Sequence, residues 1–384
     1  MKITDVQAHV VRPDYGDLRD VTNEWQWTLV TIDTDEGLHG WGEASSVPRG
    51  GSRLTGSGIE AVKEALLGEN PANIERIWHK LFRRYTYMGS RGFPSTIVSG
   101  IDIALWDLRG KALGEPVYNL LGGTFRDRVR TYANAWFAGC ETPEQFATAA
   151  VETVEAGHDA IKLDPFLEVS QYHTSYAEGQ ISAAGEEQGC DIVAAIREAV
   201  GDHVEILVDA HGHYNVPTAI RLGNRLYDES QIGWFEEPLP PENNSALKSV
   251  REQLGAPLCV GERLFTRFDF VPIFERRLAD FIMPDVVWTG GISELKKIAT
   301  MAEAYYIPIS PHNAQGPGQI LAGAQVAMTV PNFYRLEHAI SCKPAYDRLL
   351  QDPLNWEGNS LILSGRPGLG VDLNMDEVKA ATVS

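Results

Sequence analysis

The sequence predicts an eight-stranded (β/α)8 barrel of the TIM type, in a modified form, with a small α+β capping domain before it. First, short apolar runs alternate with helix-sized stretches from Val129 onward, which is typical of a parallel sheet covered by helices. Second, eight such runs fit into the length that such a barrel needs. Third, polar residues that follow the runs recur every 23 to 27 residues. The 384-residue length fits a two-domain chain.

The N-terminal part has the pattern of an α+β unit. Alternating apolar residues predict strands near Ile3–Val10, at Trp27–Asp33 and at Trp41–Ala44. Three helices follow, at Ile59–Leu67, Ile74–Tyr85 and Ser95–Leu113. The last helix has one apolar stripe and stops at Gly114-Glu-Pro. We therefore assign residues 1–125 to the capping domain.

The barrel is assigned to residues 126–345, and residues 346–384 are expected to return to the capping domain. A doubly wound sheet is the alternative, but no Gly-x-Gly-x-x-Gly follows the first strand, and the Gly365–Gly370 cluster reads as a turn. The predicted barrel strands are Arg130–Asn134, Ala160–Leu163, Glu205–Val208, Gly233–Phe235, Leu258–Val260, Phe281–Met283, Ile307–Ile309 and Tyr334–Leu336.

Composition limits the function. The net charge of −19 argues against nucleic-acid binding and against adhesion to anionic membranes, although a bound metal can still admit an anionic substrate. The four cysteines form no Cys-x-x-Cys pair, which indicates reduced thiols and no zinc cluster. The N-terminus lacks a signal-peptide pattern, and the apolar runs are far shorter than a membrane span. We therefore expect a cytoplasmic location.

Carboxylates follow three consecutive barrel strands: Asp209, Glu236 and Glu262. Because catalytic groups collect at the C-terminal face of a barrel, these side chains are expected to converge. Three oxygen ligands without cysteine suit Mg²⁺. Since side chains alternate along a strand, only one of Glu236 and Glu237 can face the barrel centre.

Further strand ends supply candidates for proton transfer. Asp285 and His312 lie on neighbouring strands, and a carboxylate beside an imidazole is the arrangement of a general base. Lys162 is either a second base or an ion-pair partner of Asp164, two residues further on. His211 shares the direction of Asp209 and is a candidate acid for a leaving group.

The pair His211-Gly-His213 also occurs in metal-dependent hydrolases. That interpretation needs further histidine ligands from later strands, and only His312 is well placed. Such hydrolases carry the pair on the first barrel strand, whereas here it follows the third. We therefore rank this alternative lower.

These residues resemble a known family. The run Ser99–Gly123 resembles the signature of the mandelate racemase and muconate-lactonizing group of the enolase superfamily. The segments Val208-Asp209, Trp234-Phe-Glu-Glu-Pro, Gly261-Glu262 and Pro311-His312 fit that group's metal and base motifs in order. The resemblance covers the whole chain. It implies Mg²⁺ held by Asp209, Glu236 and Glu262, an Asp285–His312 dyad, and Glu337 bound to the substrate carboxylate.

Within the group, the chain is most similar to sugar-acid dehydratases of the galactonate and gluconate type. Asp164 stands where racemases and lactonizing enzymes carry the second lysine of a Lys-x-Lys pair, which favours His312 as the base. The resemblance implies that His312 removes the C2 proton, that His211 protonates the departing 3-hydroxyl, and that a 2-keto-3-deoxy acid forms. Substrate-binding residues would be Asp164, Glu337, Arg263 and Asn313.

Other functions stay open at this point. The first alternative is a sugar-acid epimerase or lactone cycloisomerase of the same superfamily, and another is a catalytically silent binding relative. In the family that the chain resembles, the side of the His–Asp dyad usually serves 2R acids, which suits D-gluconate and D-galactonate. Specificity is expected in Asp17–Trp27 and Arg83–Arg91 of the cap, and the 163–190 stretch is not interpreted. Relatives commonly assemble, so a homo-oligomer is expected.

Overall fold

The computed structural model describes residues 1–12, 25–46, 50–169 and 178–383. Residues 17–24 of the expected specificity segment Asp17–Trp27, and residues 170–177 of the uninterpreted 163–190 stretch, lie outside the described residues. In the described ranges, no helix is both long and apolar enough to cross a lipid bilayer. The four cysteines are free, and three of them are buried, as predicted for reduced thiols.

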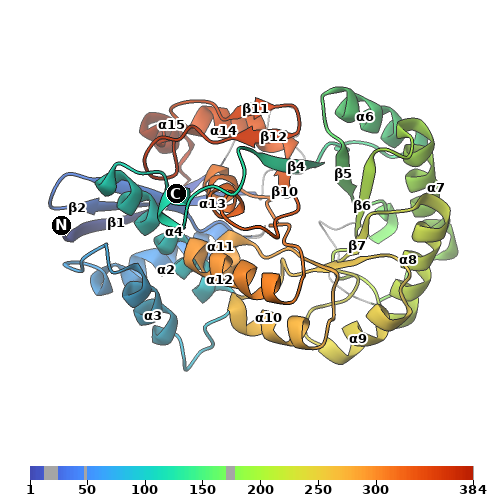
Figure 1. Ribbon diagram of the computed structural model, residues 1–384, viewed down its shortest axis with the longest axis horizontal. Helices are drawn as coiled ribbons and strands as arrows, with labels where there is room; N and C mark the ends of the chain where they lie inside the picture. Colours follow the sequence, from blue (N-terminus) through green and yellow to red (C-terminus); the bar gives the residue numbers. More distant parts are fainter. Residues whose placement is uncertain (13–24, 47–49, 170–177, 384) are drawn as a thin grey trace.

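The cap is an antiparallel sheet covered by helices, at the left of Figure 1. A separate apolar core joins this sheet to α4. Glycine makes the contact close, because a Cβ at Gly42 would lie 2.4 Å from the Gly100 carbonyl oxygen on α4. The cap elements are β1 (Ile3–Val11), β2 (Trp27–Thr34), β3 (His39–Glu43), α2 (Gly51–Val62), η1 (Lys63–Ala65), α3 (Ile74–Arg84), α4 (Phe93–Leu113) and α5 (Val117–Leu120).

Parallel strands form a closed barrel. Neighbouring strands from β4 to β9 pair in chain order, and β10 pairs with β4. Between β9 and β10, Ile309 bridges to Ile282 on one side and to Phe333 on the other, which closes the ring. The strands are β4 (Val129–Asn134), β5 (Ala160–Leu163), β6 (Glu205–Asp209), β7 (Trp234–Glu236), β8 (Leu258–Val260), β9 (Phe281–Ile282) and β10 (Leu336–Ala339).

Helices between these strands cover the outside of the barrel (Figure 1). Helix α4 of the cap contacts α11 and α12, so the cap rests on the barrel units that follow β9. The helices are α6 (Pro143–Glu155), η2 (Leu167–Val169), α7 (Ala183–Val200), α8 (Val216–Ser230), α9 (Asn244–Gln253), α10 (Thr266–Glu275), α11 (Val286–Thr289), α12 (Gly291–Ala304), α13 (Pro317–Ala327), η3 (Ile340–Cys342) and α14 (Lys343–Leu349).

Two predicted barrel strands differ from the structure by more than one residue at an end. The prediction of a strand at Ile307–Ile309 is wrong, since this stretch makes isolated bridges through Ile309 only. Pro308 has no N–H to donate to a ladder, which explains the interruption. The last strand begins at Leu336, where it pairs with Thr131, rather than at Tyr334.

The C-terminal segment contacts both parts of the molecule. The hairpin of β11 (Asn355–Glu357) and β12 (Ser360–Ile362) extends the sheet beside β4. Farther on, Val371 O accepts a hydrogen bond from Trp41 Nε1 of the cap at 2.9 Å. Helix α15 (Met375–Ala381) then packs against β1.

Candidate active site

One layer of polar side chains lies above an apolar layer inside the barrel. The apolar layer is buried and consists of Tyr132, Ala160, Leu207, Trp234, Cys259 and Met283. Because side chains alternate along a strand, the residue two positions further on points to the same side. Within the strands, those next positions are Asn134, Lys162, Asp209 and Glu236, all of them polar. These polar groups therefore lie at the C-terminal face of the barrel.

Three buried carboxylates meet at this face. Asp209 ends β6, Glu236 ends β7 and Glu262 follows β8, and one oxygen from each lies within 4.8 Å of the others. Glu237 lies outside this group, because its backbone turns at a φ of 39° and its Oε1 accepts a hydrogen bond from Gly261 N at 2.6 Å. The group offers only hard oxygen donors, which fits Mg²⁺.

Lys162 lies among three carboxylates. Its Nζ is 3.1 Å from Asp209 Oδ2, 2.5 Å from Glu236 Oε1 and 3.0 Å from Glu337 Oε1. Burial alone would lower the pKa of Lys162, but these carboxylates outweigh burial and raise the pKa well above its ordinary value. Lys162 is therefore a buried ammonium group.

Of the two alternatives for Lys162, the ion pair with Asp164 is wrong. Asp164 instead pairs with His211, with 2.9 Å between Oδ2 and Nδ1. The alternation rule that placed Asp164 beside Lys162 ends with β5 at Leu163, so Asp164 is free to turn toward the next unit.

Asp209 and Glu236 share one electrostatic environment. Burial would raise the pKa of Asp209, but His211 and Lys162 outweigh it and hold that pKa below its ordinary value. Burial raises the pKa of Glu236, and the neighbouring charge of Asp209 raises it further. Two neighbouring carboxylates repel each other when both are ionised, so a nearby positive charge stabilises the ionised pair.

The Asp285–His312 pair has the geometry of a dyad. His312 Nδ1 lies 2.7 Å from Asp285 Oδ2, while its Nε2 lies 3.3 Å from Glu262 Oε2. Burial would lower the pKa of His312, but the carboxylates of Glu337, Glu262 and Asp285 raise that pKa to about 9. The indole ring of Trp288 packs on the imidazole, with 5.3 Å between ring centroids.

His211 lies on the other side of the carboxylate group. Its Nδ1 meets Asp164, and its Nε2 lies 3.4 Å from Asp209 Oδ2. The left-handed backbone at His211, with a φ of 47°, turns the chain back, and Asp209 Oδ1 accepts its N–H at 2.9 Å. Burial would lower the pKa of His211, but Asp209 and Asp164 raise it.

Glu337 connects the two sides. Its Oε1 accepts a hydrogen bond from Asn134 Nδ2 at 2.6 Å, and its Oε2 accepts one from Asn313 N at 3.0 Å. The Asn313 Nδ2 donates to the Glu337 carbonyl oxygen at 3.1 Å. Burial would raise the pKa of Glu337, but Lys162 and His312 hold it below its ordinary value.

Two candidates from the sequence remain, Arg263 and His213. Arg263 Nε is 3.3 Å from Glu262 Oε1. His213 does not contact the carboxylate group within the described part of the chain, and its buried Nε2 has no hydrogen-bond partner there. This placement gives no support to a His211–His213 metal pair.

The sequence interpretation missed four contributors to the site: Asn134, Trp288, Gln319 and Glu43. Asn134 ends the first barrel strand in the same layer as Lys162, so the period of two could have identified it. Gln319 Nε2 donates to Asp285 Oδ2 at 2.6 Å. No sequence pattern connects Gln319 with a residue 34 positions away.

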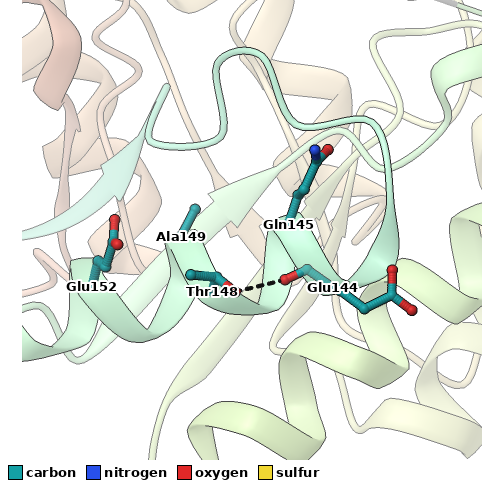
Figure 2. Close-up of a pocket in the computed structure, with 5 residues that line it drawn as sticks. All are labelled: Glu144, Gln145, Thr148, Ala149 and Glu152. Atoms are coloured by element: carbon teal, nitrogen blue, oxygen red, sulfur yellow. Dashed lines mark hydrogen bonds between the residues drawn. The ribbon is translucent and has the colours of Figure 1, made fainter.

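A hollow on the outer surface is separate from these residues. Figure 2 shows it along α6, lined by Glu144, Gln145, Thr148, Ala149 and Glu152. Thr148 Oγ1 donates to the Glu144 carbonyl oxygen at 2.8 Å. A single helix forms this lining, and none of its residues lies at the end of a barrel strand.

Two family descriptions together match most of the chain. Residues 18–122 match "Mandelate racemase / muconate lactonizing enzyme, N-terminal domain", and residues 145–378 match "Enolase C-terminal domain-like". The chain is 36% identical over 386 residues to D-xylonate dehydratase of Haloferax volcanii, covering 100% of this chain and 89% of the relative. It is 34% identical to D-galactonate dehydratase of Pectobacterium atrosepticum, covering 98% and 94%.

Solved structures give the same result. A member of the enolase superfamily from Salmonella Typhimurium superposes with a TM-score of 0.91 at 31% identity and covers 100% of both chains. A mandelate racemase/muconate lactonizing enzyme-like protein from Rubrobacter xylanophilus has a TM-score of 0.88 at 36% identity, covering 100% of this chain and 98% of the other.

Proposed function

Because the chain belongs to the mandelate racemase/muconate lactonizing enzyme group of the enolase superfamily, we propose that it is a hydro-lyase that dehydrates a sugar acid. Relatives that match nearly its whole length are named for D-xylonate and D-galactonate dehydration. The proposed reaction removes the C2 proton and the 3-hydroxyl of an aldonic acid and yields a 2-keto-3-deoxy acid.

This proposal rests on one observation. Two histidines, each hydrogen-bonded to its own carboxylate, lie on either side of the three carboxylates that could hold a metal. His312 Nε2 approaches Glu262, and His211 Nε2 approaches Asp209. Elimination of water needs one group that takes a proton and one that gives a proton. A binding protein has no need for two such pairs.

The carboxylate group fits a resident divalent cation. Asp209, Glu236 and Glu262 are buried, and Lys162, Arg263 and the two histidines lie close to their oxygens. We propose that these three residues hold Mg²⁺. When bound, Mg²⁺ would stabilise the enediolate charge that forms on the substrate carboxylate, as is general for enolase-superfamily sites.

The side chains of this protein perform the proton transfers. Asp285 accepts the Nδ1 hydrogen of His312. The charge of Glu262 helps to raise the pKa of His312, and a cation held by Glu262 would offset that charge, which would free Nε2 to take the C2 proton. The C3–O bond then breaks, and His211 delivers a proton to the departing oxygen, so that water leaves. Asp164 holds Nδ1 of His211 and directs Nε2 toward the substrate side. The enol product becomes the 2-keto acid by tautomerisation.

We assign Glu337, Asn313, Asp164 and Arg263 to substrate binding. Without substrate, Glu337 is ionised and accepts hydrogen bonds. The negative charge of a bound substrate carboxylate would favour protonation of Glu337, and the protonated side chain could then donate a hydrogen bond to that carboxylate. Lys162 balances the same negative charge from below. Arg263 lies beside Glu262 and can reach a polar group of the substrate.

A panel of aldonic acids with Mg²⁺, scored for 2-keto product, tests the proposal. We expect turnover of at least one 2R acid, such as D-xylonate, D-gluconate or D-galactonate. A His312→Asn variant should lose both turnover and exchange of the C2 hydrogen in D₂O. Product without a 2-keto group would instead indicate an epimerase or cycloisomerase, and C2 exchange that survives in H312N would contradict the base assignment.

A further inference from the structure

The carboxylate partner of His312 has a second donor on the same oxygen. Asp285 Oδ2 accepts His312 Nδ1 at 2.7 Å and Gln319 Nε2 at 2.6 Å, while Oδ1 accepts Val287 N at 2.8 Å. Asp285 is fully buried, so water does not complete its hydrogen bonding. Gln319 therefore limits the rotation of the carboxylate that orients the imidazole.

The amide of Gln319 is held in one orientation. Its Oε1 accepts a hydrogen bond from Gln315 N at 2.7 Å. If the amide were flipped, its NH₂ would face that N–H and its oxygen would face Asp285, so both contacts would be repulsive. The donor therefore points at Asp285, and this direction depends on the position of the start of α13.

The start of α13 is in turn held by the cap. Glu43, at the end of β3, accepts hydrogen bonds from Gly316 N at 2.7 Å and from Gln319 N at 3.0 Å. A Cβ at Gly316 would lie 2.7 Å from Glu43 Oε1, and a Cβ at Gly318 would lie 2.7 Å from Glu43 Cβ. The two glycines thus make room for a buried carboxylate from the other domain.

A second contact connects the same cap segment with the imidazole. Trp288, whose ring packs on His312, donates its Nε1 hydrogen to the Ser45 carbonyl oxygen at 3.0 Å. Ser45 is two residues beyond Glu43. The end of β3 thus reaches His312 by two routes, one through Gln319 and Asp285 and one through Trp288.

We propose that Gln319 is a positioning residue for the His312 base and that Glu43 of the cap positions Gln319. The inference rests on the proposed function, in which His312 takes the C2 proton. Neither residue touches substrate. Their effect is on the direction of His312 Nε2, and a misdirected base slows proton abstraction without weakening substrate binding.

The same helix offers a matched control. Gln325 is as buried as Gln319, with 1% exposure each. Its Nε2 donates to the Leu369 carbonyl oxygen at 3.1 Å, and its Oε1 accepts from Tyr118 N at 2.8 Å. Gln325→Met therefore removes two side-chain hydrogen bonds, as Gln319→Met does, but leaves Asp285 intact. Methionine keeps the volume of glutamine closely enough to fill the site.

The experiment compares Q319M, Q325M and the full-length wild type. Its readouts are kcat and KM on the best aldonic acid, the thermal midpoint, and the low-field proton resonance of the His312 Nδ1 hydrogen, which is assigned by its loss in H312N. We expect Q319M to lose about 10- to 100-fold in kcat with KM within about threefold, and to shift the resonance. Q325M should keep kcat within about twofold and leave the resonance in place, with a similar loss of thermal midpoint.

Glu43→Gln is the second variant, since an amide presents one acceptor where a carboxylate presents two. We expect a fall in kcat of about 3- to 10-fold and the same direction of resonance shift. The proposal is overturned if Q319M matches Q325M in both kcat and resonance. A wild type that dehydrates no aldonic acid, with a resonance shifted in Q319M alone, would refute the proposed function and leave the positioning role supported.

Discussion

Lys162→Met gives the most direct test of the charge balance in the site. Methionine keeps most of the length of the side chain but removes the ammonium group of Lys162, which lies within 3.1 Å of Asp209, Glu236 and Glu337. These carboxylates are buried, so water cannot replace the lost partner. The variant therefore leaves uncompensated negative charge inside the barrel.

The size of the effect follows from these distances. Unit charges about 3 Å apart attract by about 5 kcal/mol at an effective dielectric constant near 20. Desolvation of the ammonium group offsets most of the combined attraction, and loss of one member of a buried ion pair costs about 3–5 kcal/mol. With an unfolding entropy of about 0.8 kcal/mol/K for a chain of this length, the thermal midpoint should fall by about 4–6 °C.

Magnesium should change this result. Without the lysine, the three carboxylates attract a divalent cation more strongly, and tenfold tighter binding adds about 1.4 kcal/mol, or about 2 °C, at saturating Mg²⁺. We expect differential scanning fluorimetry, with and without Mg²⁺, to show a larger metal-induced rise in K162M than in the wild type.

Lys111→Met is the control for this measurement. Lys111 Nζ pairs with the buried Asp107 Oδ2 at 2.7 Å and also with Asp372, at the contact between the cap and the C-terminal segment. Its loss should lower the thermal midpoint to the same extent with and without Mg²⁺. If Mg²⁺ raises the midpoint of K162M no more than that of the wild type, then Lys162 does not share its carboxylates with a cation.

Three further predictions concern pH, packing and proton delivery. Burial raises the pKa of Asp102 to about 7 from an ordinary value of 3.8, so the folded state binds this proton more tightly than the unfolded state does. The resulting stabilisation, up to about 4 kcal/mol, is lost as pH rises from about 4 through 7. Asp102→Asn should flatten urea-unfolding stability over this window, and an unchanged slope would contradict the assignment. Gly316→Ala places a Cβ 2.7 Å from Glu43 Oε1 and should destabilise the fold by about 1–3 kcal/mol by the same unfolding measurement, whereas a neutral result would mean that Glu43 moves freely. His211→Asn should keep C2 exchange in D₂O but lose most 2-keto product, and full dehydration by this variant would remove the acid role.

Periodicity in the sequence was sufficient to locate most of the barrel. The predicted strands Ala160–Leu163 and Leu258–Val260 agree with β5 and β8, because short apolar runs bounded by turn residues have few alternatives in a parallel sheet. The run Ile307–Ile309 failed because strand formation also depends on backbone donors, which Pro308 lacks. The β11–β12 hairpin was missed, although Gly358-Asn359 between its strands is a two-residue turn signal.

The sequence could locate candidate site residues only where a regular element determines their direction. The strand ends of a parallel barrel share one face, so Asp209, Glu236 and Glu262 could be expected together from their spacing. Beyond the last strand residue this rule no longer applies, which is why Asp164 was placed beside the wrong partner. The contact between Glu43 and the start of α13 joins residues more than 270 positions apart, and no local pattern encodes it.

Buried carboxylates of the cap join the domains at the helices that follow the dyad strands. Asp102 on α4 accepts hydrogen bonds from Ser293 N and Oγ at the start of α12, and Glu43 does the same for α13. Asp285 precedes α11, which leads directly into α12, and His312 precedes α13. The cap therefore accepts hydrogen bonds from the first turns of two helices that follow the dyad residues. An N–H group left open there by a displaced cap would cost about 1–3 kcal/mol when buried. We therefore expect docking of the cap and alignment of the dyad to be coupled through Glu43 and Asp102, two members of the acidic surplus of the sequence.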